Sequence, residues 1–134
     1  MRITADTNVL VRAALMDHPT RSAVAARALV EAEAVALTLP SLCEFVWVLT
    51  RGYKTDAVEV ATAIRKLIES ASVIVDRLAV EAGLRVLERG GDFADGVIAF
   101  DGRRAGGRVF VSFDRRAVAL IHVTLGDAQL LSTH

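Results

Sequence analysis

The stretch Ile3-Thr4-Ala5-Asp6-Thr7-Asn8-Val9-Leu10 places a short apolar strand directly before an acidic residue and the start of a helix. Residues 3–5 have the alternating pattern of a strand, and from Val9 onward the apolar residues recur at helical spacing. Strand, turn and helix in this order begin a βα unit. Because ligands of open α/β sheets bind beyond the carboxyl ends of the strands, Asp6 stands where a site is expected.

The rest of the chain repeats this alternation of short apolar strands and longer helices. Further strands are predicted at residues 35–39, 73–75 and 108–112, with an edge strand at 122–125. Helices are predicted at residues 23–30 (capped by Thr20), 42–50 (capped by Ser41), 55–70 (capped by Thr55), 76–89, 93–105 (capped by Asp92) and from Arg115. This order predicts an α/β fold, with a mostly parallel sheet covered by helices on both faces.

Length and composition favour one globular domain over residues 1–134. The 134 residues are 53% hydrophobic and contain no repeat or linker, which excludes disordered and fibrous classes. Charges interrupt every apolar window that could span a bilayer, and the charged start does not resemble a signal peptide. With a single cysteine, Cys43, the chain forms no internal disulfide, so we expect a cytoplasmic protein without membrane association.

Net charge gives no sign of a global nucleic-acid-binding field. Lys and Arg total 16, as do Asp and Glu. Binding to phosphate would therefore depend on a local patch or on metal ions that neutralise the phosphate.

Four acidic residues are the candidates for a metal site. Asp6 and Asp114 each follow a predicted strand, whereas Glu44 and Asp95 are expected in the first turn of a helix. Helices that follow the strands can open onto the same crevice, so all four carboxylates could converge. Clustered carboxylates repel one another unless a cation is present, and their hard oxygens suit Mg²⁺ or Mn²⁺. Such metals support in-line displacement at phosphorus.

Each acid also has a purely structural interpretation. Asp6 and Asp114 could simply cap the helices that follow them, and capping alone would explain Asp92. Glu44 and Asp95 lie among apolar residues, where a charge is costly unless it is paired or bound to a ligand. The three histidines, among them the terminal His134, lack the spacing of metal ligands.

Four motifs carry a resemblance to a known family over nearly the whole chain. They are residues 3–10, Pro40-Ser41-Leu42-Cys43-Glu44, Asp92-Phe93-Ala94-Asp95-Gly96-Val97-Ile98-Ala99 and Val111-Ser112-Phe113-Asp114-Arg115-Arg116. Each is weak alone, but four in this order are specific. The chain resembles the PIN-domain ribonucleases, and among them the small VapC-type toxins of bacterial type II toxin–antitoxin systems.

The resemblance implies a three-layer α/β/α fold and an endoribonuclease that uses Mg²⁺ or Mn²⁺. It assigns the metal site to Asp6, Glu44, Asp95 and Asp114. It gives supporting positions to Asn8, Ser112 and Thr7. Asp92 is a helix cap first and a supporting residue of the site second, and Arg115 is our first choice for contact with the substrate phosphate. The resemblance also implies a homodimer, a VapB-type antitoxin that silences the toxin, and a tRNA, rRNA or mRNA substrate.

Two alternatives stay open at this point. A receiver-type phosphoacceptor domain also places acids at strand ends, but it needs a lysine after a late strand, and Lys54 and Lys66 lie in the middle of the chain. A PIN-like binding module without catalysis is the other alternative, and the presence of all four acids argues against it.

Overall fold

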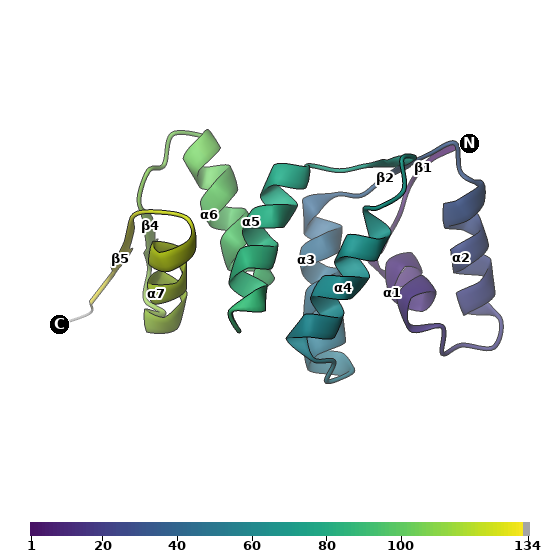
Figure 1. Cartoon of the computed structure of the whole chain (residues 1–134), viewed down its shortest axis with the longest axis horizontal. Coiled ribbons are helices and arrows are strands. Elements are labelled where there is room, and N and C mark those ends of the chain that lie inside the picture. Colours follow the sequence, from purple (N-terminus) through teal and green to yellow (C-terminus); the bar gives the residue numbers. More distant parts are fainter. Residues whose placement is uncertain (133–134) are drawn as a thin grey trace. The chain divides into compact units, whose positions relative to one another are not determined.

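The computed structural model describes residues 1–132, in which strands and helices alternate along the chain (Figure 1). His134 lies outside the described residues. The chain divides into two compact units, Met1–Asp76 and Arg77–His134, and each is described by itself.

The first unit is built on three parallel strands in the order β1-β2-β3. These are β1 (Arg2–Thr4), β2 (Ala34–Ala36) and β3 (Val73–Ile74). Ile3 is paired with Val35, and Val35 with Val73, so β-branched residues run across the sheet in register. The carboxyl end of β1 leads directly to Asp6.

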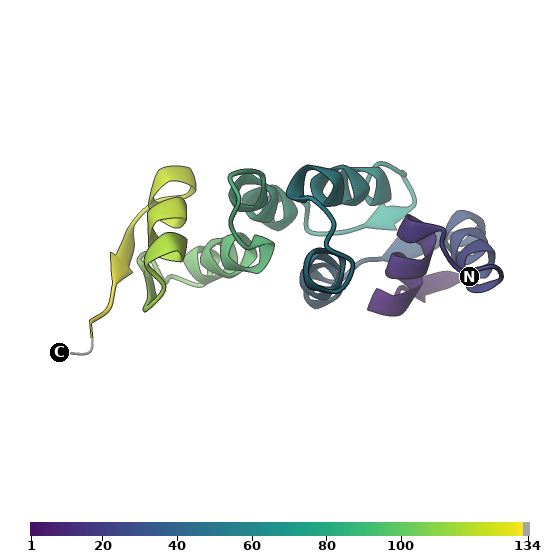
Figure 2. The same ribbon diagram turned by 90° about the horizontal axis from the view of Figure 1, so that it is seen from below.

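Five helical segments connect or follow these strands. They are α1 (Thr7–Leu15), α2 (Arg21–Glu31), α3 (Leu39–Trp47), the π-helix η1 (Val48–Gly52) and α4 (Ala57–Leu67). α1 packs against both α2 and α3, and its Leu10 is fully buried together with Leu42 and Phe45 of α3. Figures 1 and 2 show α1 beside α2 in both views. This core fixes the start of α1 relative to α3.

The second unit contains α5 (Arg77–Glu88), α6 (Phe93–Arg104), β4 (Phe110–Ser112), α7 (Arg115–Thr124) and β5 (Ala128–Leu130). β4 and β5 are parallel, with Val111 opposite Gln129. α5 is buried along most of one side and packs closely on α6. The carboxyl end of β4 leads to Asp114 at the start of α7.

Two glycines let α5 and α6 approach each other at backbone distance. A Cβ added to Gly96 would lie 2.5 Å from the carbonyl oxygen of Ala82 and 2.7 Å from the Cα of Gly83. A Cβ on Gly83 would lie 2.7 Å from the ring of Phe93, which is fully buried. Gly96 therefore belongs to the helix contact that holds the first turn of α6 and, with it, Asp95.

The predicted α/β class with parallel strands is confirmed, and most predicted elements occur within a few residues of their expected bounds. The edge strand predicted at residues 122–125 is wrong. α7 continues through Thr124, and the last strand is β5, in the tail that carried little sequence pattern. His122 to Thr124 continue the helical periodicity that buries Ile121, and this outweighs the β-propensity of Val123 and Thr124.

Several predicted helix caps also differ from those observed. α3 is capped by Thr38, whose hydroxyl accepts from the backbone N–H of Ser41 at 3.2 Å, so Ser41 is not the cap. The N-cap of α4 is Asp56, one residue after the predicted Thr55. Thr20 stands at the N-cap of α2 without a side-chain capping bond, and His18 Nδ1 accepts from the N–H groups of Thr20 and Arg21 instead. Neighbouring polar residues compete for these positions, and pattern alone does not choose among them.

In the part of the chain that the structure describes, no helix is long and apolar enough to cross a membrane.

Candidate metal site

The first unit brings Asp6 to the start of α1, directly after β1. Asp6 is the N-cap of this helix, and its Oδ1 accepts from the backbone N–H of Thr7 at 2.8 Å. The capping interpretation is thus correct, and it is compatible with a second role. Within residues 1–132 the other carboxylate oxygen accepts no hydrogen bond, so it is available to a ligand.

Thr7 joins Asp6 to Glu44. The buried Thr7 hydroxyl donates to Oε1 of Glu44 at 3.4 Å, while the Thr7 N–H donates to Asp6. Both carboxylates line one open cleft of about 370 Å³, formed by Asp6, Thr7, Asn8, Val11, Arg12, Glu44, Val48 and Tyr53. The structure therefore brings together four sequence-predicted site residues: Asp6, Glu44, Thr7 and Asn8.

Glu44 differs from its prediction in two ways. It lies in the second turn of α3 rather than the first, because the helix begins at Leu39. It is also exposed, although its neighbours Leu42, Phe45 and Val46 are buried. Helix geometry sends those three to the core and leaves Glu44 on the outer face of α3. Because the Glu44 carboxylate is exposed, the free-energy cost of burying a charge does not support a metal-binding role for Glu44.

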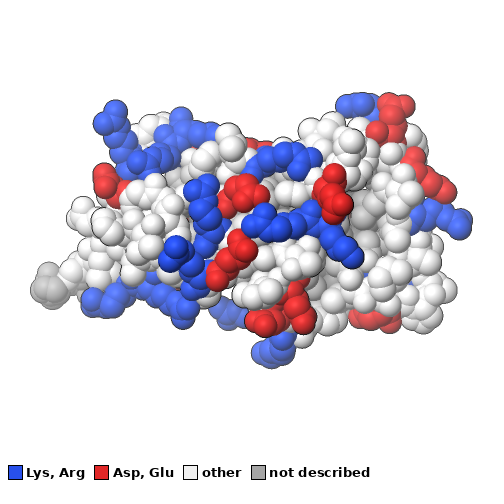
Figure 3. Space-filling model, in the orientation of Figure 1, with Lys and Arg blue, Asp and Glu red and all other residues white. Residues whose placement is uncertain are grey.

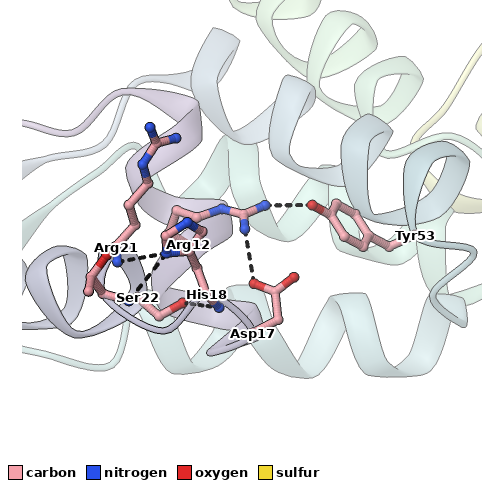
Figure 4. Close-up of polar contacts among 7 residues, drawn as sticks. Arg12, Asp17, His18, Arg21, Ser22 and Tyr53 are labelled. Atoms are coloured by element: carbon pink, nitrogen blue, oxygen red, sulfur yellow. Dashed lines mark hydrogen bonds and ion pairs between the residues drawn. The ribbon is translucent and has the colours of Figure 1, made fainter.

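Arg12 and Tyr53 also line the cleft, and the sequence analysis missed both. The Arg12 guanidinium donates to Asp17 Oδ1 at 3.0 Å and to the Tyr53 hydroxyl (Figure 4). Arg12 lies four residues after Asn8, on the same face of α1, so helical spacing could have found it. Tyr53 follows a π-helix, which no simple periodicity predicts.

In the second unit Asp114 has the same position relative to β4 as Asp6 has to β1. It is the N-cap of α7, and its Oδ1 accepts from the N–H groups of Arg116 at 2.9 Å and Ala117 at 3.1 Å. The Ser112 hydroxyl accepts from the Asp114 N–H at 3.0 Å and so fixes the backbone from which this carboxylate projects. Ser112 and Asp114 are therefore in direct contact.

Asp95 lies in the first turn of α6, as predicted, near two other acids. Burial raises the pKa of Asp95, and the negative charges of Asp92 and Asp114 raise it further. Asp92 caps α6 by accepting from the Ala94 N–H at 3.0 Å, so its predicted cap role is confirmed. The surroundings of Asp95 in the second unit therefore disfavour its ionised form. A bound cation would offset the repulsion from Asp92 and Asp114.

Arg115 is exposed next to Asp114 in the first turn of α7. In the described range its guanidinium makes no ion pair or hydrogen bond, whereas that of the neighbouring Arg116 donates to the Gly90 carbonyl at 2.8 Å. On the face drawn in Figure 3, basic and acidic side chains are intermixed, in keeping with the balanced net charge. Arginine contacts to phosphate would therefore be local ones.

The carboxylates suit a hard divalent cation. Asp6 and Glu44 supply oxygens in one unit, and Asp95 and Asp114 do so in the other. Among residues 1–132, no group of three or more His, Cys, Asp or Glu side chains is assembled that could hold a metal by itself. Mg²⁺ does not require such a cage, because it keeps several waters and is held by one or two carboxylates together with substrate phosphates. Each pair therefore has the donor chemistry that Mg²⁺ uses.

Comparison with known proteins gives a family over nearly the whole chain. No curated protein matches it. The PIN domain family, however, matches residues 3–122, a range that includes residues of both units and all four acids. PIN domains are generally metal-dependent nucleases, and the match, with seven α-helices and parallel strands in the described residues, supports the three-layer α/β/α class of PIN-like folds. The chain belongs to the PIN domain family.

Proposed function

We propose that this protein is a metal-dependent endoribonuclease in which Asp6, Glu44, Asp95 and Asp114 hold Mg²⁺ or Mn²⁺. The observation that carries the proposal is the pairing of these acids. Thr7 links Asp6 to Glu44 at an open cleft, and Asp95 has a raised pKa beside Asp114. Acids paired in this way, in a family of nuclease-type fold, favour metal-assisted cleavage of a phosphodiester.

When bound, the metal supplies an activated water and neutralises charge that develops on the phosphate. The chain's own residues orient the donors. Thr7 holds Asp6 and Glu44 through its N–H and hydroxyl, and Ser112 fixes the backbone of Asp114. We assign Asn8 to the cleft wall as a polar contact for substrate or water. Arg115, exposed beside Asp114, is suited to a charge-assisted contact with a phosphate oxygen.

We further propose that the biological role is that of a VapC-type toxin acting in the cytoplasm on tRNA, rRNA or mRNA. In this proposal a VapB-type antitoxin silences the nuclease, and the toxin forms a homodimer. Trp47 is 61% exposed beside the buried Phe45 and Val46, and such an apolar side chain suits a protein interface. Light scattering at high concentration tests the dimer, and a monomer there would contradict it.

Substitution of Asp95 by Asn tests the nuclease proposal. Asp95→Asn keeps the size of the side chain and removes the negative charge. We expect the wild-type protein to cleave single-stranded RNA with Mg²⁺ or Mn²⁺, and the variant to lose roughly a hundredfold or more of that rate. Circular dichroism should report the same fold for both. Undiminished cleavage by folded Asp95→Asn would refute the assignment, and a folded, inactive wild-type protein would favour a PIN-like binding module.

A further inference from the structure

We propose that Tyr53 is a stacking platform for one unpaired base of the RNA, and that Arg12 holds its ring in place. This inference rests on the proposed nuclease function and names the part of the substrate that the first unit contacts. It draws on the cleft that contains Asp6 and Glu44, on the Arg12 contacts, and on the π-helix that precedes Tyr53.

The cleft walls differ in chemistry. Asp6 and Glu44 supply carboxylates, whereas Val11, Val48 and the Tyr53 ring supply apolar surface. A nucleotide has the matching division, because its phosphate suits a metal held by carboxylates while its base has flat apolar faces. A cleft of about 370 Å³ that carries both surfaces is in the size range of small-ligand sites.

Arg12 serves this cleft as an anchor for Tyr53 more than as a phosphate contact. Its guanidinium makes an ion pair with Asp17 at 3.0 Å, so its charge is already balanced. It also donates to the Tyr53 hydroxyl and lies 6.0 Å from the centre of the ring (Figure 4). This hydrogen bond restrains the hydroxyl end of the Tyr53 ring, although the residue is 43% exposed. An exposed aromatic ring that is restrained in this way is preorganised for stacking.

The backbone before Tyr53 is specialised. Within the π-helix η1, Thr50 donates its hydroxyl to the Val46 carbonyl at 2.8 Å. The N–H of Tyr53, directly after η1, donates to the Val48 carbonyl. Lys54 follows with a φ of 54°, a conformation uncommon for residues other than glycine. π-Helical turns are frequently found at functional sites. Here the π-helical turn η1 places Tyr53 in the lining of the cleft that also contains Asp6 and Glu44.

Four substitutions at Tyr53 separate stacking from a structural role. Phe keeps the ring and loses the hydrogen bond from Arg12, and Trp loses that bond too but compensates with a larger stacking face. Leu keeps apolar bulk without an aromatic face, and Ala removes both. We expect Tyr53→Leu and Tyr53→Ala to raise the KM for single-stranded RNA roughly ten- to a hundredfold with kcat unchanged. Tyr53→Trp should retain the wild-type KM, and Tyr53→Phe should show a smaller increase than Tyr53→Leu.

A binding assay keeps this inference separate from the nuclease proposal. Fluorescence anisotropy with a labelled single-stranded oligoribonucleotide is measured in the Asp95→Asn protein, with and without Tyr53→Leu. An abasic oligonucleotide of the same length is the second probe. We expect Tyr53→Leu to weaken binding of the RNA by the same factor as it raises KM, and to leave binding of the abasic probe unchanged. The assay remains decisive even where the wild-type protein fails to cleave, since that result bears only on the nuclease proposal.

Phe100→Leu is the matched control, because it removes an aromatic ring that also lies under an arginine, Arg104 at 4.6 Å from the ring centre, at a position that does not line the cleft. It should leave KM and both affinities unchanged. Stacking is overturned by a wild-type KM and affinity in folded Tyr53→Leu, by equal losses in the Phe and Leu variants, or by an equal loss on the abasic probe. A loss of kcat without a change in KM would also overturn it.

Discussion

At the scale of single residues, Asp95 carries a charge that its surroundings oppose. An acid in the first turn of a helix normally gains about 0.3–1 kcal/mol from the helix dipole. The raised pKa of Asp95 means that burial and the charges of Asp92 and Asp114 outweigh this gain. In the absence of metal, the ionised carboxylate therefore lowers the stability of the fold.

The first prediction concerns the pH dependence of that cost. A raised native pKa means that the cost is absent below about pH 3.9, the ordinary aspartate value, where Asp95 is protonated in both states. The cost grows as the pH rises through the native pKa and is complete above it. With chelator present, Asp95→Asn should therefore unfold at a higher temperature than the wild-type protein at pH 7, and the difference should disappear near pH 3.5. Thermal denaturation across this range measures it, and a constant difference would contradict the prediction.

At the scale of secondary-structure elements, the contact of α5 with α6 depends on Gly96. Substitution of a helical glycine by alanine ordinarily stabilises a helix by about 1 kcal/mol. Here the added Cβ would press on the backbone of Ala82 and Gly83, which has no flexible side chain to move away. We predict that Gly96→Ala lowers the free energy of unfolding by about 1–3 kcal/mol, as overpacking does elsewhere. Urea denaturation provides the measurement.

Gly102 is the matched control within the same helix. A Cβ at Gly102 meets nothing within 4 Å, so Gly102→Ala should gain up to about 1 kcal/mol. A lower free energy of unfolding for Gly96→Ala and a higher one for Gly102→Ala would establish the close contact between α5 and α6. Equal stabilisation by both would mean that α5 and α6 are farther apart than described.

Periodic elements were predictable from sequence, whereas residues placed by exceptions to periodicity were not. β1, α1 and β4 were recognisable because alternation and helical spacing each mark a buried side. β5 was missed because Ala128-Gln129-Leu130 is too short to show a pattern, and its pairing with β4 is non-local. The role of Gly96 was not predictable, since close contact with another helix is not visible in one sequence segment.

In the candidate site, residues at the starts of regular elements were likewise predictable, whereas those placed by irregular backbone or by helix packing were not. Asp6, Asp95 and Asp114 stand at element starts, which local signals reveal. Tyr53 depends on the π-helix η1 and the unusual φ of Lys54, two departures from regular backbone. The Thr7 bridge from Asp6 to Glu44 likewise depends on the packing of α1 against α3.

At the scale of the whole molecule, metal binding should couple to stability. A ligand that binds only the folded state adds about 2.7 kcal/mol at a concentration one hundred times its Kd. We predict that Mn²⁺ raises the Tm of the wild-type protein and has little effect on Asp95→Asn. Differential scanning calorimetry with NaCl at matched ionic strength controls for screening of surface charge. Equal Tm increases in both proteins would mean that Mn²⁺ binds elsewhere.

The most direct test of the central claim is the rate of Mg²⁺-dependent RNA cleavage by Asp6→Asn and by Asp114→Asn, each measured beside the wild-type protein. These two residues stand in different units, and Asn replaces Asp as an N-cap at little cost, so both variants should remain folded. If carboxylates of both units serve one metal-dependent reaction, each substitution alone should reduce the rate by roughly a hundredfold or more. Wild-type cleavage by either folded variant would contradict the claim.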